Sequence, residues 1–118
     1  MNRKKELKAA YKEKKHKSGI YQIKNLVNAK IYIGESKDLE AIWNRIRFQL
    51  NMGSHRVSDL QREWKEYGEA NFTYEILDVI KAEDGLDIDR ELKAAEQMYL
   101  EELNPFGERG YNKKKKTQ

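Results

Sequence analysis

Two short stretches, Gly19-Ile20-Tyr21 and Tyr32-Ile33-Gly34, decide the fold of this 118-residue chain. Each combines a glycine with β-branched and aromatic residues, a composition typical of strands. The asparagine-containing segment 25–29 between them favours a turn. The pattern therefore predicts a hairpin with strands over 19–25 and 30–34, which places one tyrosine on each of two adjacent strands.

After the hairpin, apolar residues recur at helical spacing in three segments and lie on both faces of one strand-like segment. Ser36 or Asp38 can cap the first of these helices, Gly53 ends it, and Pro105 ends the last. The predicted elements are a helix over 3–16, the hairpin, helices over about 38–52 and 57–67, a strand over 71–80 and a helix from the acidic segment 83–91 to residue 103.

These elements predict a small α/β (α+β) layer fold, with a three-stranded antiparallel or mixed sheet flanked by helices. The third strand is expected to be covered on both sides, because its end is apolar on both faces. The last helix is expected to bury an apolar stripe made of Leu86, Ile88, Leu92, Ala95, Tyr99 and Leu103.

The composition indicates one domain without a membrane segment. The chain has 38% hydrophobic and 37% charged residues, and no apolar run approaches the roughly 18 residues of a bilayer span. It contains no cysteine, which excludes disulfides, thiolate metal ligands and a cysteine nucleophile. No apolar stretch follows the basic N-terminal residues, so a secretory signal is not expected and a cytoplasmic location is predicted.

Charge is distributed unevenly along the chain. Residues 1–17 form a basic helical extension with eight Lys or Arg against two Glu, residues 18–112 form an acidic body, and residues 113–118 form a lysine-rich tail. The basic ends suit a polyanion such as nucleic acid, because each lysine displaces counterions from phosphate. Terminal lysines that only keep a small domain in solution are an equally good interpretation.

Five polar side chains are candidates for phosphodiester chemistry, which requires a cation on the phosphate, an activated water and a stabilised leaving group. Glu96 lies in an apolar helical segment where a carboxylate could bind a metal, although most such glutamates border a solvated face. Tyr21 and Tyr32 could position or deprotonate water; the residues alone favour packed strand aromatics. His55 could accept a proton, although a loop histidine is usually just exposed. Asn112 could hydrogen-bond substrate or backbone, although an asparagine near a terminus is more often a turn residue.

Taken together, the two tripeptides and the residues after them resemble the GIY-YIG nuclease family. The likeness covers residues 18–112, and it depends on the ordered set rather than on either tripeptide alone. The matching positions are Ser18-Gly19-Ile20-Tyr21, Ile23, Asn25, Lys30-Ile31-Tyr32-Ile33-Gly34, Ser36-Lys37-Asp38-Leu39, Trp43-Asn44-Arg45, Gly53-Ser54-His55, Leu60-Gln61, Trp64, Tyr67-Gly68-Glu69, Phe72, Ile76-Leu77, Glu96, Glu102-Leu103-Asn104 and Gly110-Tyr111-Asn112.

The resemblance implies an endonuclease that cleaves phosphodiester bonds of DNA with one metal ion. Tyr21 and Tyr32 match the two tyrosines near the scissile phosphate, one of which is expected to activate the attacking water. Glu96 matches the metal ligand, which would bind Mg²⁺ or Mn²⁺. His55 and Asn112 match two further catalytic residues of the family.

The resemblance also suggests how the chain meets its partners. Gly19 and Gly34 are expected where the backbone approaches the phosphate or the following helix closely. The tail lysines Lys113, Lys114, Lys115 and Lys116 would add affinity for DNA. No separate DNA-recognition domain is visible, so specificity would be low or supplied by a protein partner, and no membrane partner is expected.

The chain departs from the family pattern at two positions of one helix. Ile42 stands where the homing-endonuclease pattern has an arginine that contacts the scissile phosphate, and Ile46 stands where it often has histidine or tyrosine. Arg45 is a candidate substitute from the same side of the helix, although a surface arginine paired with an acid is an equally good interpretation.

Three hypotheses follow from the matches and the departures. The first, which we favour, is an active metal-dependent DNA endonuclease. The second is a degenerate module that binds nucleic acid or a protein partner without turnover. The third is a structural or regulatory subunit whose basic ends fold on an acidic partner.

Overall fold

A computed structural model describes residues 16–114 of the chain. The predicted N-terminal helix, apart from its last residue, and Lys115 and Lys116 lie outside this range. The elements are, in order, β1 (Ser18–Asn25), β2 (Ile31–Ser36), α2 (Leu39–Met52), α3 (Ser58–Tyr67), the 3-10 helix η1 (Glu69–Asn71), β3 (Phe72–Ile80), α4 (Ile88–Leu103) and the 3-10 helix η2 (Gly107–Arg109). Within the described range, no helix is long and apolar enough to cross a bilayer.

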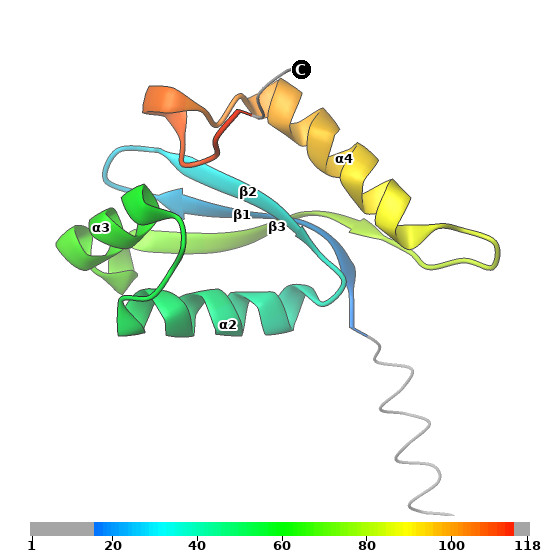
Figure 1. Cartoon of the computed structure of the whole chain (residues 1–118), viewed down its shortest axis with the longest axis horizontal. Coiled ribbons are helices and arrows are strands. Elements are labelled where there is room, and N and C mark those ends of the chain that lie inside the picture. Colours follow the sequence, from blue (N-terminus) through cyan, green and yellow to red (C-terminus); the bar gives the residue numbers. More distant parts are fainter. Residues whose placement is uncertain (1–15, 115–118) are drawn as a thin grey trace, which may run out of the picture.

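The three strands form one antiparallel sheet in the order β2-β1-β3. The hairpin register pairs Tyr21 with Gly34 and Ile23 with Tyr32, so these four residues share one face of the sheet. Helices α2 and α3 cover that face and α4 covers the other (Figure 1). The predicted layer fold is therefore confirmed.

The main core fills the space between the sheet and the pair α2 and α3. Its buried members are Tyr21, Ile23, Tyr32, Leu39, Ile46, Leu50, Leu60, Trp64, Phe72 and Tyr111. Trp43 stacks on Tyr74 with 4.8 Å between ring centroids and meets Trp64 edge-on. These aromatic contacts fix the position of α2 on the sheet.

The last helix begins in the second half of the acidic segment where its start was predicted. A start within residues 83–91 is right, but the first residues of that segment turn at Gly85, whose φ is 83°, and Asp87 caps the helix by accepting a hydrogen bond from a first-turn backbone N–H. The predicted apolar stripe is wrong at both ends, because Leu86 and Leu103 are each 36% exposed. A helix on one face of a small sheet buries only the side chains that point at the strands.

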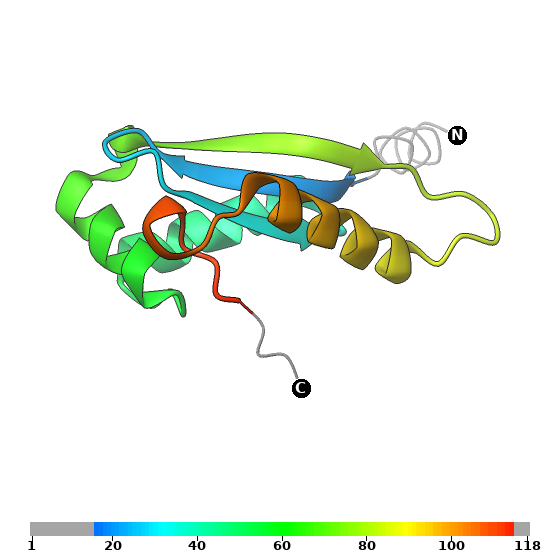
Figure 2. The same ribbon diagram turned by 90° about the horizontal axis from the view of Figure 1, so that it is seen from above.

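The third strand, an edge strand of the sheet, exposes two of its apolar side chains, which corrects the expectation that both of its faces are covered. Helix α4 lies mainly over β1 and β2, and β3 runs along the open side (Figure 2). Ile76 and Val79 are consequently 48% and 42% exposed. The apolar residues at the end of this segment reflect the strand propensity of β-branched side chains rather than burial.

Candidate active site

An open groove of about 920 Å³ runs along the β2 edge of the sheet, between α4, the connection from α2 to α3, and the C-terminal segment. The polar side chains that matter for chemistry are contributed by each of these elements. They are Tyr32, Arg56, Glu96, Asn112, Lys113 and Lys114. Residues far apart in the sequence thus meet at one edge of the sheet, and five of these six, all but Arg56, belong to the predicted site.

Tyr32 lines the groove and packs between the rings of Tyr21 and His55. Its ring centroid is 6.4 Å from that of Tyr21, and it meets the ring of His55 edge-on at 6.4 Å. Tyr21 is 4% exposed and packs on Tyr74 from the other side. Of the two predicted tyrosines, Tyr32 therefore lines the groove, and Tyr21 supports it from within the core.

Both phenols are held in the protonated form. Burial raises the pKa of Tyr21 far above its ordinary value, and the neighbouring Tyr32 and the charge of Glu96 raise it further. Burial also raises the pKa of Tyr32; the Arg56 guanidinium opposes this shift, and Glu96 adds to it. Each phenol is thus a hydrogen-bond donor at neutral pH, and its deprotonation would require an additional cation nearby.

The two predicted glycines do sit at points of close approach, but the neighbours differ from those expected. A Cβ atom at Gly34 would overlap the hydroxyl group and ring of Tyr21, and one at Gly19 would overlap the backbone of β3 at Asp78. The glycines therefore make room for a tyrosine ring and for a neighbouring strand, whereas the sequence suggested the phosphate or the next helix.

Glu96 projects from α4 into the groove and is partly buried. Its charge acts on both tyrosines, as their pKa shifts show. Within residues 16–114 there is no cluster of three or more His, Asp or Glu that could enclose a metal. A single carboxylate in an open groove nevertheless suits Mg²⁺, which keeps several waters and is commonly held by one or two carboxylates together with substrate phosphate.

His55 supports the loop between α2 and α3 rather than lining the groove. Its Nδ1 accepts a hydrogen bond from the Val57 backbone N–H at 3.1 Å, and its own backbone N–H donates to Gln61 at 2.9 Å. Burial and the nearby Arg56 lower the pKa of the imidazole. The neutral ring therefore carries its proton on Nε2 at neutral pH, since Nδ1 is the acceptor.

Asn112 clamps the C-terminal segment onto the edge of β2. Its Nδ2 donates to the Ile33 carbonyl and its Oδ1 accepts from the Ile33 N–H, both at 2.9 Å. Next to it, the Tyr111 backbone N–H donates to the Ile31 carbonyl at 2.9 Å. The sequence left open whether this side chain hydrogen-bonds substrate or backbone; in the structure it bonds the backbone of β2.

The structure does not bring Arg45 to the groove. Arg45 is exposed on α2, and the groove lining does not include it. The two departures from the family pattern on the same helix are core residues: Ile46 is 3% exposed, and Ile42 packs against the core cluster. The arginine that does reach the groove is Arg56, which sequence reasoning missed although it directly follows the predicted site residue His55.

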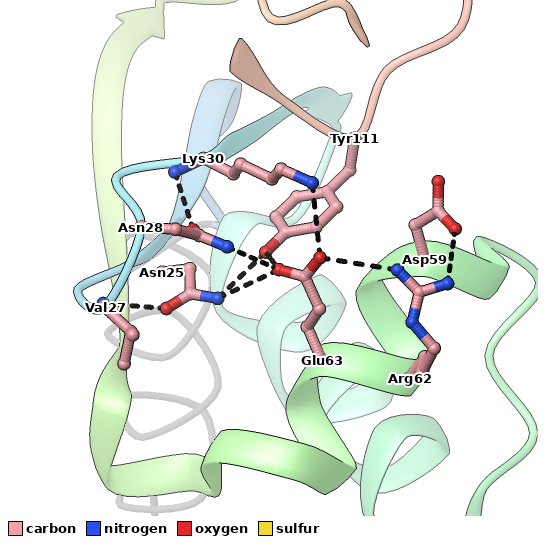
Figure 3. Close-up of polar contacts among 8 residues, drawn as sticks. All are labelled: Asn25, Val27, Asn28, Lys30, Asp59, Arg62, Glu63 and Tyr111. Carbon is pink, nitrogen blue, oxygen red and sulfur yellow. Dashed lines mark hydrogen bonds and ion pairs between the residues drawn. The ribbon is translucent and has the colours of Figure 1, made fainter. Parts of the chain in front are cut away.

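A buried acid, Glu63, is a second residue that sequence reasoning missed. Its Oε1 accepts hydrogen bonds from Tyr111 Oη and Asn28 Nδ2, both at 2.7 Å, and its Oε2 lies 3.2 Å from Lys30 Nζ (Figure 3). This network joins α3 to the turn between β1 and β2 and to the C-terminal segment. Its signal in the sequence is a glutamate on the apolar face of α3, directly before Trp64.

The comparisons with known proteins support the fold. No family model matches the chain. Intron-associated endonuclease 1 of Enterobacteria phage T4 is 42% identical over 88 residues, 75% of this chain, and the chain spans about a third (34%) of the length of that protein.

Two solved structures cover the catalytic domain of the homing endonuclease I-TevI, each at 38% sequence identity. One, a point mutant, aligns with a TM-score of 0.70 over 81% of this chain and 92% of the solved domain. The other aligns with a TM-score of 0.68 over 80% of this chain and 96% of the domain. The chain belongs to the GIY-YIG nuclease family.

Proposed function

We propose that this chain is a metal-dependent DNA endonuclease domain that hydrolyses phosphodiester bonds. The observation that carries the proposal is the groove at the β2 edge, where the Tyr32 phenol and the Glu96 carboxylate line one open space. The proposal is also supported by 38% identity to a solved endonuclease catalytic domain over 81% of this chain.

Hydrolysis adds one water to the ester. The water oxygen forms a bond to phosphorus and the water gives up one proton, one P–O ester bond breaks, and the released alkoxide takes up a proton. Tyr32, held protonated by burial, can donate a hydrogen bond to a phosphate oxygen. Tyr21 holds the Tyr32 ring in place from the core side.

Glu96 would hold Mg²⁺ or Mn²⁺, which when bound supplies positive charge to the phosphate and the leaving oxygen. Lys113 and Lys114 are exposed residues of the groove lining and would attract the DNA backbone. Because the chain spans a third of the T4 relative, we expect sequence specificity to come from a further segment or a protein partner.

Nicking of supercoiled plasmid DNA in Mg²⁺ or Mn²⁺ tests the proposal. We expect the wild type to nick the plasmid and Glu96→Ala to lose about 100-fold or more of the rate, the scale of a lost transition-state contact. Glu102→Ala is the matched control, because this exposed glutamate lies on the same helix outside the groove lining. Equal and negligible nicking by the wild type and Glu96→Ala would overturn the proposal.

A second function, DNA binding without turnover, is favoured by one observation. Ile42 packs against the core at the position where the family pattern has a phosphate-binding arginine, so that position carries no charge. Under this alternative the wild type binds DNA with a steep salt dependence in the same buffers but never cleaves it.

A further inference from the structure

The groove contains one arginine among its described lining residues, Arg56. It stands in the connection between α2 and α3, and its side chain is exposed. Its Nη2 donates to the Tyr32 hydroxyl oxygen at 3.4 Å. A guanidinium group has five N–H donors, so this long hydrogen bond, the one that the side chain makes among residues 16–114, leaves Arg56 with donors for an anion in the groove.

The position of Arg56 differs from that of other arginines in the described part of the chain. Arg47 lies 3.7 Å from Glu69, and Arg62 lies 3.1 Å from Asp59. Both therefore form ion pairs with exposed acids, Arg47 with one in η1 and Arg62 with one in α3. Arg56 instead contacts a phenol that lines the groove.

The charge of Arg56 also reaches the groups of the candidate site. The guanidinium lowers the pKa of Tyr32 and of Tyr21, in opposition to the carboxylate of Glu96. The same positive charge would act on a phosphate placed between Tyr32 and Glu96. A cation at this point would add to the charge that a bound metal supplies, because phosphodiester hydrolysis builds up negative charge on the phosphate oxygens.

We infer that Arg56 is the cation that binds the scissile phosphate, supplied from the α2–α3 connection instead of from position 42 of α2. The inference rests on the proposed endonuclease function and adds a catalytic residue to it. A planar guanidinium can bind two phosphate oxygens at once, which a lysine cannot do.

Plasmid cleavage by a set of single variants tests the inference. We expect Arg56→Ala to lose about 100- to 1000-fold of the cleavage rate, as when an enzyme loses one oxyanion donor. Arg56→Lys should be intermediate, because it keeps the charge and loses the bidentate geometry. Arg90→Ala is the neutral control, since Arg90 is exposed near the start of α4 and outside the groove lining; it should stay within about 2-fold of the wild type.

Chemical rescue separates catalysis from a structural role. Free guanidinium ion at millimolar concentration should restore part of the cleavage by Arg56→Ala and none of the cleavage by Glu96→Ala. Thermal unfolding of Arg56→Ala should match that of the wild type, because the residue is exposed. A loss of activity that tracks a loss of folding, without rescue, would overturn the catalytic role.

The failure of this inference is distinct from the failure of the proposed function. Suppose that the wild type cleaves the plasmid, that Glu96→Ala does not, and that Arg56→Ala cleaves like the wild type. The catalytic role of Arg56 is then rejected, and the proposed endonuclease function is retained. Loss of cleavage in Arg45→Ala rather than in Arg56→Ala would assign the cation to α2 instead. If the wild type fails to cleave the plasmid in Mg²⁺ and also in Mn²⁺, both the proposed endonuclease function and the role of Arg56 are rejected.

Discussion

The ring of Tyr21 lies directly against the backbone of Gly34 on the neighbouring strand. The two residues are paired across β1 and β2, and a Cβ atom at position 34 would overlap the Tyr21 hydroxyl group and the ring carbon that bears it. The glycine of the second tripeptide therefore makes room for the tyrosine of the first. This contact explains in physical terms why the two tripeptides occur together at this separation.

We predict that Gly34→Ala destabilises the folded protein. Overpacking of a core contact lowers the free energy of unfolding by about 1–3 kcal/mol. For a domain of this size, each kcal/mol lowers Tm by roughly 4–8 °C. Thermal unfolding followed by circular dichroism measures the effect. Adding Tyr21→Phe should recover part of the loss, because the nearest overlapping atom is removed; strictly additive effects of the two changes would contradict the contact.

The buried carboxylate of Glu63 and its hydrogen-bond donors form a second pairing, which was not predicted from the sequence. Burial alone would raise its pKa, but hydrogen bonds from Tyr111, Asn28 and Lys30 hold the pKa below its ordinary value of about 4.5. Since the folded-state pKa is the lower one, ionised Glu63 stabilises the fold above that ordinary value. The contribution disappears as the pH falls through the folded-state pKa.

We predict that Glu63→Gln lowers the free energy of unfolding by about 3 kcal/mol at neutral pH, because Lys30 loses its charged partner and an amide N–H₂ faces hydrogen-bond donors. The difference from the wild type should shrink as the pH falls below the folded-state pKa of Glu63. Urea denaturation across the acid range measures both effects. Glu108→Gln, the same change at an exposed site, should leave stability nearly unchanged; a pH-independent deficit for Glu63→Gln would contradict the assignment.

The elements that the sequence predicted well are those set by local patterns. The hairpin follows from strand residues on both sides of an asparagine turn, and the Asp38 cap and the Gly53 stop bound α2 as expected. The start of α4 was predicted only to within residues 83–91, because acidic residues permit helix and turn alike, and the turn at Gly85 precedes its first residue. The open edge at β3 depends on where α4 docks, which is tertiary information.

The candidate site was predictable only as far as the family pattern reaches. That pattern picked out Tyr32 and Glu96, which the structure brings to one groove. Arg45 was proposed as the substitute cation from helical spacing, which is visible in the sequence. The contact between Arg56 and Tyr32 instead joins a loop to a strand. A pairing of that kind is set by packing, so residue spacing cannot reveal it.

The paired hydrogen bonds between Asn112 and Ile33 give this predicted site residue a positioning role. They extend the edge of β2 by one side chain and bring the segment that carries Lys113 to the groove. An amide side chain offers one donor and one acceptor side by side, which an ionised carboxylate cannot do.

We predict that Asn112→Asp releases the C-terminal segment, because the carboxylate keeps the acceptor for the Ile33 N–H but sets an oxygen against the Ile33 carbonyl. The free energy of unfolding should fall by about 1–3 kcal/mol. Hydrogen exchange at the Ile33 amide should accelerate, while Asn44→Asp, the same change on the exposed face of α2, should affect neither quantity. Unchanged stability and unchanged exchange at Ile33, together with a loss of DNA cleavage, would instead assign Asn112 a direct contact with substrate.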